Sequence, residues 1–146
     1  MIDVGITGCY NTGVVKSRYR QNAGVVFSLK YHLVWCPKYR KPVLVDAVAE
    51  SLVALIKLKA AELGATIHAL EVMPDHVHLF VESDPTRAPT HIAAQFKGFT
   101  SNRLCKEFPH LRTRLPSLWS RSYYIGSLGE ASASTIQHYI EAQRGR

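Results

Sequence analysis

The chain has 146 residues, of which 47% are hydrophobic and 20% are charged, and its formal net charge at pH 7 is +7. This composition predicts one globular domain and no membrane span, because no apolar run approaches the roughly 18 residues that a span requires. The amino terminus also lacks the charged and apolar regions of a secretory signal, so we expect a soluble cytoplasmic protein. The excess of Lys and Arg favours a polyanionic partner, with nucleic acid as the first candidate.

Two kinds of chemistry lack their usual motifs. Cys9, Cys36 and Cys105 are far apart and form no Cys-x-x-Cys pair, so the sequence predicts reduced thiols rather than a zinc site or disulfide exchange. It also has no Gly-x-x-x-x-Gly-Lys-Ser/Thr loop, so nothing indicates hydrolysis of a nucleoside triphosphate. Any phosphoryl-transfer reaction would therefore have to conserve the energy of the phosphodiester bond that it breaks.

The first part of the chain, residues 1–24, is rich in Gly, Thr and Asn, then basic, and has neither helical nor strand periodicity. We expect a flexible arm there, followed by one domain over residues 25–146. The alternative is a basic strap across nucleic acid, in which Tyr19 stacks on a base.

A strand and a helix open the domain. Residues 25–35 are rich in β-branched and aromatic residues and predict a first strand. A helix is expected over residues 46–63, with Asp46 as its N-cap, Gly64 as its stop and an apolar stripe that faces the core.

A hairpin and a second helix should follow. A strand over residues 65–73 turns at Pro74–Asp75 into a strand that begins at His76, which predicts a β-hairpin. The next helix should begin near Pro89, because an apolar stripe starts there. The residues of that stripe are Ile92, Phe96, Phe99 and Leu104.

The last part of the chain is predicted to be a loop, a strand and a helix. Prolines interrupt residues 108–122, and this loop either grips phosphates or is simply solvated. Its basic and aromatic side chains are Arg112, Arg114, Arg121, His110 and Trp119. A strand over residues 122–128 precedes a final helix that Ser132 or Ser134 caps and that runs through Gln143.

The predicted order, β-α-β-β-α-β followed by a helix, defines an α+β fold class. It is the order of the ferredoxin-like split βαβ layout, an antiparallel sheet with helices on one face. The other face of the sheet should be open, and the C-terminal helix is an addition to this layout.

Two histidines stand out in the third strand. Side chains alternate between the two faces of a strand, so His76 and His78 share one face while Val77, Leu79 and Val81 share the buried one. The Cα atoms of the two histidines would lie roughly 7 Å apart, close enough for both imidazoles to bind one divalent cation. A pair of surface histidines without a ligand is the alternative, and the spacing alone does not decide between the two.

Other residues near this motif are assigned by their position. Asp75 should face away from the metal and have a role in the turn, and Glu82 should lie about 13 Å beyond His78, too far for the same ion. Tyr139 and Gln143 would share one face of the last helix, and periodicity alone favours packing of Tyr139 in the interior. No chemical role is given to His32, His68, His91 and His110.

Three segments together resemble a known family. They are KYHLVWCPKYR at residues 30–40, MPDHVHL at residues 73–79 and YIEAQ at residues 139–143. In this order they resemble the single-tyrosine HUH transposases of small bacterial and archaeal insertion sequences, which move as single-stranded DNA. The resemblance extends from about Phe27 to Gln143.

The resemblance implies a DNA transposase that cleaves and rejoins single-stranded DNA at insertion-sequence ends through a 5′-phosphotyrosine intermediate. It implies that His76, His78 and Gln143 bind a Mg²⁺ or Mn²⁺ ion and that Tyr139 is the nucleophile. It also implies a homodimer in which the tyrosine helix of one subunit reaches the histidine pair of the other. The DNA partner would carry a hairpin near each element end, which places the protein at the nucleoid.

Two other functions stay open. A domesticated relative would process hairpins in chromosomal repeats without moving an element, and the DNA that flanks the gene would distinguish it by having or lacking subterminal palindromes. A non-catalytic ferredoxin-like protein would bind nucleic acid by stacking bases on Trp119, Tyr123 or Tyr124. It would need neither the metal nor Tyr139.

Overall fold

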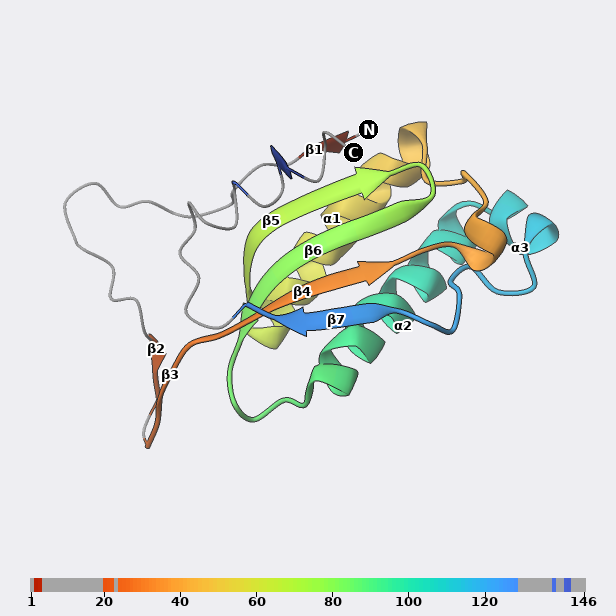
Figure 1. Cartoon of the computed structure of the whole chain (residues 1–146). Helices are drawn as coiled ribbons and strands as arrows, with labels where there is room; N and C mark the ends of the chain where they lie inside the picture. Colours follow the sequence, from red (N-terminus) through yellow and green to blue (C-terminus); the bar gives the residue numbers. More distant parts are fainter. Residues whose placement is uncertain (1, 4–19, 23, 129–137, 139–140, 143–146) are drawn as a thin grey trace.

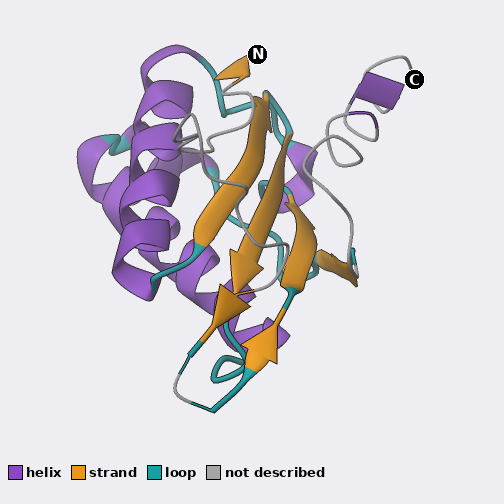
Figure 2. Cartoon of the chain, turned by 90° about the vertical axis from the view of Figure 1, so that its left-hand side faces the viewer, coloured by secondary structure: helices purple, strands orange, loops and turns teal. Residues whose placement is uncertain are grey.

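The computed structural model describes residues 2–3, 20–22, 24–128, 138 and 141–142. The main strands and helices follow in the predicted order, and they form an antiparallel sheet with two long helices on one of its faces (Figure 1, Figure 2). The α+β, ferredoxin-like fold class is therefore confirmed. The predicted C-terminal helix falls mostly outside the described residues.

Four strands make up the body of the sheet. They are β4 (Leu29–Trp35), β5 (Thr66–Met73), β6 (His76–Ser83) and β7 (Tyr124–Ser127). Their order is β5-β6-β4-β7 with antiparallel neighbours throughout, which is the arrangement of the split βαβ unit. The predicted hairpin is present, because β5 and β6 pair with each other on either side of the turn at residues 74–75.

Three short strands are formed by the described residues near the amino terminus. β1 (Ile2–Asp3) pairs with β5 at the edge of the sheet, and β2 (Arg20–Gln21) pairs with β3 (Val26–Phe27). The sequence predicted no regular structure before residue 25, because a two-residue strand has no hydrophobic period to signal it. Arg20 connects this segment to the domain, since its Nη2 donates a hydrogen bond of 3.2 Å to the carbonyl oxygen of Gly64.

The first helix, α1 (Asp46–Leu63), ends as predicted but begins differently. Gly64 ends the helix with a φ of 67°, a left-handed conformation that glycine adopts without strain. The prediction that Asp46 is the N-cap is wrong, because Val45 takes that position and no side chain caps the helix. Asp46 is instead in the first turn, where its negative charge still complements the helix dipole.

The second helix, α2 (Pro89–Glu107), begins at the predicted proline, whose missing N–H costs nothing in the first turn. The loop that should follow contains a further helix, α3 (His110–Arg114). Pro109 directly precedes α3, so the residue interpreted as a breaker lies at a helix start. Within the described ranges, no helix is both long and apolar enough to cross a membrane.

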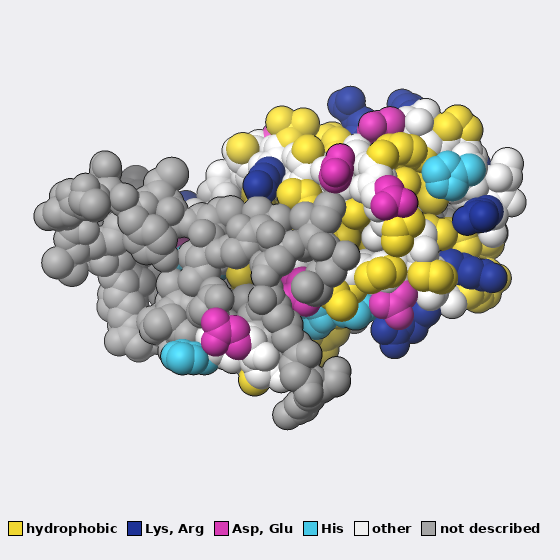
Figure 3. Space-filling model, turned by 90° about the horizontal axis from the view of Figure 1, so that it is seen from above, with side chains coloured by type: hydrophobic (Ala, Val, Ile, Leu, Met, Phe, Trp, Pro, Cys, Tyr) yellow, Lys and Arg dark blue, Asp and Glu magenta, His cyan; other side chains and the backbone are white. Residues whose placement is uncertain are grey.

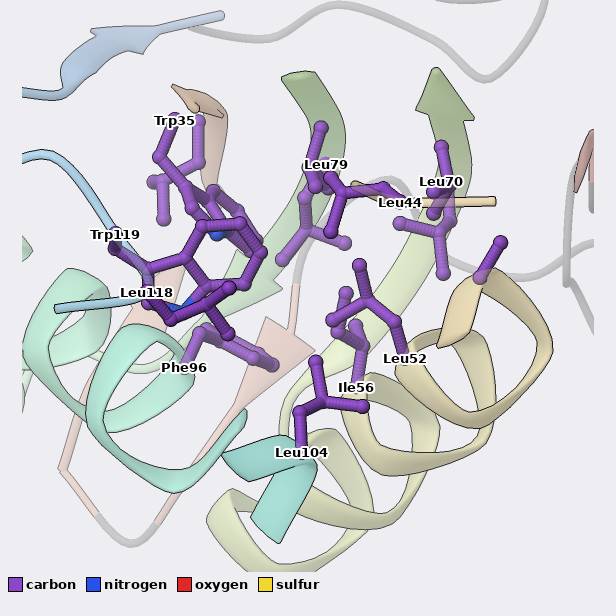
Figure 4. Packing of buried hydrophobic residues seen from close by; sticks show 14 of the residues in the cluster. Trp35, Leu44, Leu52, Ile56, Leu70, Leu79, Phe96, Leu104, Leu118 and Trp119 are labelled. Carbon is purple, nitrogen blue, oxygen red and sulfur yellow. The ribbon is translucent and has the colours of Figure 1, made fainter. Parts of the chain in front are cut away.

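The main core lies between the two long helices and the sheet, and Figure 4 shows its packing. Leu70 and Leu79 of the sheet meet Leu52 and Ile56 of α1, and each of these side chains is at most 1% exposed. Burying one such side chain contributes about 1.5–3 kcal/mol. Because a slip of one residue would turn this apolar set toward the other face, the core fixes the register of β6 and with it the face on which the histidines lie.

A tight turn, η1 (Lys38–Arg40), follows β4. Tyr39 has a φ of 59° and Arg40 a φ of 51°, and a left-handed conformation costs a residue other than glycine about 1–2 kcal/mol. Backbone hydrogen bonds hold the turn in place, including one of 2.9 Å from Lys38 N to the carbonyl oxygen of Leu118. The surrounding structure therefore imposes a strained backbone at two consecutive residues.

Candidate functional site

The side chains of His76 and His78 lie on the face of the sheet opposite α1 and α2. The residue between them, Val77, is completely buried in the core, and the two imidazole ring centroids are 4.9 Å apart. Ring contacts add side chains from the neighbouring strands β4 and β7 to the same face. We call this surface the histidine face and define it by His32, His76, His78, Phe80 and Tyr124.

The residue before His76 holds its imidazole ring. The Nδ1–H of His76 donates a hydrogen bond of 2.6 Å to Asp75 Oδ1, and Asp75 Oδ2 accepts one of 3.1 Å from Arg40 Nη2. The hydrogen bond from His76 is the main cause of the lowered pKa of Asp75. Asp75 lies in the turn, as predicted. Because the alternation of a strand does not apply within a turn, its side chain reaches the Nδ1 of His76.

His78 has its partner on the neighbouring strand. The sequence suggested no role for His32, but His32 Nε2 lies 3.0 Å from His78 Nδ1, and the two rings are stacked with centroids 5.3 Å apart. Phe80 also stacks on His32, with a centroid distance of 4.2 Å. The contact between His32 and His78 depends on the register of β4 against β6, in which Val34 lies opposite His78. A single sequence does not give that register.

Burial keeps two of these imidazoles neutral. It lowers the pKa of His32 to about 4 and the pKa of His78 to about 4, and repulsion from a neighbouring histidine adds to the effect in both cases. Neutral imidazole is the form that binds a metal ion. At neutral pH His78 therefore needs to lose no proton before it acts as a ligand.

The hydrogen bonds of the pair suit a metal site. Both Nδ1 atoms are engaged, so each imidazole has its Nε2 available, and an engaged second nitrogen fixes the tautomer of a metal-binding histidine. A hard cation such as Mg²⁺ would also need oxygen donors. Among the described residues, no group of three His, Cys, Asp or Glu side chains is placed to hold an ion. The predicted third ligand, Gln143, and the predicted nucleophile, Tyr139, lie outside the described residues.

A cleft of about 430 Å³ lies beside the histidine pair. Its lining residues come from one end of the sheet, where β4 ends and where β6 and β7 begin, and Figure 1 shows these strand ends. Its lining includes both histidines, Arg40 and the consecutive residues Ser122, Tyr123 and Tyr124. A guanidinium, hydroxyls and aromatic rings around the histidines can accommodate a phosphate together with an attached base.

Tyr124 belongs to this cleft but points along its own strand. Its ring meets His32 edge-on at 5.7 Å, and a Cβ built on Gly126 would lie 2.5 Å from the Tyr124 hydroxyl. The absence of a side chain at Gly126 therefore makes room for the phenol, which extends toward residue 126 and away from the end of β4 that lines the cleft. In this position Tyr124 offers the cleft an aromatic ring rather than a nucleophilic oxygen.

A second polar cluster lies at the far end of β6. Glu82 forms a hydrogen bond of 2.9 Å with His68 Nε2, and its carboxylate lies 3.8 Å from Arg20 Nε. Its role in this cluster agrees with its predicted separation from the histidine pair. This side of the sheet is less open than predicted, because several of its residues are buried: Lys30, His32, Glu71, Phe80 and Glu82.

Charges of both signs are interspersed on the described surface. In Figure 3, Lys and Arg side chains lie mostly along the upper and right-hand rim of the described part of the molecule, with Asp and Glu among them. An excess of positive charge favours a polyanion but does not by itself say where the polyanion binds.

Comparison with known sequences gives the family. The sequence profile described as "Transposase IS200 like" matches residues 25–143. The ISDra2 transposase TnpA of Deinococcus radiodurans is 38% identical over 129 residues, which cover 87% of this chain and 92% of that protein. The transposase for insertion sequence element IS200 of Salmonella typhimurium is 27% identical over 119 residues, which cover 80% of this chain and 78% of that protein.

Solved structures agree with this comparison. The crystal structure of a protein described as a transposase of Deinococcus radiodurans superposes with a TM-score of 0.71 at 38% identity, over 85% of this chain and 97% of the other. A REP-associated tyrosine transposase bound to a REP hairpin has a TM-score of 0.50 at 14% identity, over 84% of this chain and 67% of the other, and supports the fold alone. Fold and site together define a ferredoxin-like protein with a paired-histidine face. The chain belongs to the family of IS200-like transposases.

Proposed function

We propose that this transposase cleaves and rejoins single-stranded DNA at the ends of an insertion sequence. Tyr139 would be the nucleophile, and a Mg²⁺ or Mn²⁺ ion would be held by His76, His78 and Gln143. The observation that carries the proposal is the histidine pair, whose Nδ1 atoms are both engaged so that both Nε2 atoms are available beside a cleft. The family of the chain gives independent support.

The proposed reaction exchanges one phosphodiester for another. A divalent cation in this site would act as a Lewis acid on the scissile phosphate. The phenol oxygen of Tyr139 attacks phosphorus and loses its proton to solvent, the bond from phosphorus to the 3′ oxygen breaks, and that oxygen takes up a proton. The products are a 5′-phosphotyrosine and a free 3′-hydroxyl. Attack by another 3′-hydroxyl then reseals the strand and releases the phenol, so no nucleoside triphosphate is needed.

The described residues prepare the site for this exchange. His78 is neutral and oriented by His32, and His76 is oriented by Asp75. Preorganised side chains lower the cost of reaching the reactive geometry, because they need not be ordered when the substrate binds. Tyr139 would begin as a weak nucleophile, since an unperturbed phenol has a pKa of about 10 and keeps its proton at neutral pH.

We also propose a hairpin-bearing DNA partner and a homodimer. A net charge of +7 favours DNA, and one protein of the same fold was solved bound to a REP hairpin. In the dimer, Tyr139 of one subunit would meet the histidine pair of the other. The identity of 38% to a transposase of an insertion sequence favours element mobility over a domesticated function, and palindromes flanking the gene would decide between them.

The first test is a covalent adduct. Purified protein, Mg²⁺ and single-stranded DNA that carries the element end with its hairpin should give a protein–DNA adduct on a denaturing gel, and Tyr139→Phe should abolish it. Tyr124→Phe serves as the matched variant and should still form the adduct. An adduct that survives Tyr139→Phe would reject the assigned nucleophile, and no adduct with wild-type protein would favour a non-catalytic binder.

The second test concerns the dimer. A His76→Ala variant and a Tyr139→Phe variant, each inactive alone, should regain part of the cleavage when mixed, because hybrid dimers would contain one intact composite site. The cleaved fraction is measured on a labelled oligonucleotide after the subunits have been allowed to exchange. If successive affinity purification of the two differently tagged variants recovers hybrid dimers and cleavage is still absent, the active sites are not shared.

A further inference from the structure

The turn η1 combines backbone strain with an exposed aromatic side chain. Tyr39 and Arg40 both have left-handed φ values, and Tyr39 is 71% exposed. Strained residues persist where the surrounding structure over-determines them, and they cluster at sites of function. A large exposed ring on a strained backbone gains nothing for the core, so the fold itself does not account for it.

Two other segments hold this turn and the chain around it. Leu118 accepts the backbone hydrogen bond of Lys38, Pro37 pairs with Trp119, and after the turn Leu44 N donates a hydrogen bond of 3.0 Å to the carbonyl oxygen of Pro74. The turn is therefore fixed both to the loop before β7 and to the hairpin that carries His76. Its direction relative to the histidine pair is set by the fold.

The side chains of the turn are directed to two places. Arg40 lines the cleft beside His76 and reaches Asp75 through its Nη2 at 3.1 Å. The Nζ of Lys38 lies 5.7 Å from the centroid of the Tyr39 ring. A guanidinium in the cleft, an exposed ring next in sequence and an ammonium near that ring are the groups that bind one phosphate and one base.

We propose that η1 is a binding subsite for single-stranded DNA, in which Arg40 binds a backbone phosphate beside the histidine pair and Tyr39 stacks on an adjacent unpaired base. The inference rests on the proposed function, because it assigns part of the same substrate to the same cleft. With this left-handed backbone, Arg40 lines the cleft while the ring of Tyr39 stays exposed outside it. A duplex does not fit this role, since its bases are already stacked on each other and present no free face to Tyr39.

The strain gives a test that separates binding from folding. Asn tolerates the left-handed region better than Tyr, so Tyr39→Asn should leave the melting temperature unchanged or raise it. The same variant should bind a fluorescent oligothymidylate of about 20 nucleotides, without hairpin or metal, about 10-fold more weakly in fluorescence anisotropy. Tyr39→Phe keeps the ring and should bind as wild type does. Binding of a duplex should be the same in all three proteins.

The arginine is tested through its charge. Arg40→Asn should weaken oligothymidylate binding and lower the slope of log affinity against log salt concentration by about 0.7, the value for one phosphate of a single strand. Lys57→Gln on the exposed side of α1 removes the same charge away from the cleft and should leave both quantities unchanged. The affinity for Mn²⁺ alone, measured by calorimetry, should change far less than the affinity for DNA, which separates a phosphate contact from an effect through Asp75.

The outcomes distinguish this subsite from the proposed reaction. The subsite is rejected if Tyr39→Asn binds oligothymidylate as tightly as wild type, or if Arg40→Asn and Lys57→Gln have equal salt slopes. Should wild-type protein form the covalent adduct in that case, the proposed reaction stands without the subsite. If the variants lose binding as expected but wild type forms no adduct, the subsite stands and the proposed cleavage fails.

Discussion

The two faces of β6 consist of alternate residues of one strand, yet different forces maintain them. Leu79 and Val81 are completely buried against the helices, whereas His76 and His78 are partly exposed, and each depends on one hydrogen bond to its Nδ1. Burial of apolar area is non-directional, so many side chains of similar size can fill the core. The histidine face depends on the direction of individual hydrogen bonds. The comparison predicts that substitutions on one face reduce stability and that substitutions on the other reduce function.

The largest effect is expected when Leu79 and His78, adjacent residues on opposite faces of β6, are each replaced by alanine. Leu79→Ala should lower the free energy of unfolding by about 2–5 kcal/mol in urea titrations, while the folded fraction keeps its metal affinity. His78→Ala should change stability by no more than about 1 kcal/mol. It should, however, lower the affinity for Mn²⁺ by more than roughly 100-fold. That factor is the upper range for losing a residue that only hydrogen-bonds a metal ligand. Equal losses of stability in the two variants would contradict the division of roles between the faces.

A smaller loss of metal affinity is expected from substitutions of His32, because this residue would act on the metal only through His78. His32→Phe keeps a ring that can stack on Phe80 but lacks the nitrogen that contacts His78 Nδ1. The affinity for Mn²⁺ in calorimetry should fall about 10- to 100-fold. His32→Gln places an amide oxygen where it can accept that hydrogen bond, and should recover part of the loss. If Phe and Gln have the same effect, His32 contributes packing alone.

The smallest expected effect is on the pH dependence of stability without metal. His32 and His78 have pKa values of about 4 in the folded protein, and an unfolded histidine has about 6.5. Between these values the unfolded chain binds more protons, so stability should rise with pH from 4 to 6.5 and fall on acidification through the same window. His32→Phe should lower this slope by at most about 1.4 kcal/mol per pH unit, and solvent screening makes the change smaller. An unchanged slope in urea titrations at several pH values would show that His32 is not protonated on unfolding.

Parts of the fold with a strong local signal could be predicted from the sequence. α1 ends at Gly64, α2 begins at Pro89, and the turn at residues 74–75 joins the two strands of the hairpin. These features depend on residues a few positions apart, where periodicity and backbone preference decide the outcome. The short helix α3 was missed because proline can end one helix and precede another.

The supporting residues of the candidate site could not be predicted in this way. His32 is 46 residues from His78, and Arg40 is 35 residues from Asp75. Asp75 is adjacent to His76, but the alternation rule did not predict its hydrogen bond to His76, because the rule does not hold within a turn.

The sequence by itself determined the order of the elements, the face of β6 on which the histidines lie, and the resemblance that led to the family. Only the tertiary structure decided what surrounds those histidines. The register of β4 against β6 brings His32 to them, and the turn η1 brings Arg40, and both arise from contacts between distant segments. Local propensity acts over a few residues, whereas these hydrogen bonds exist only after the core has fixed the position of each strand.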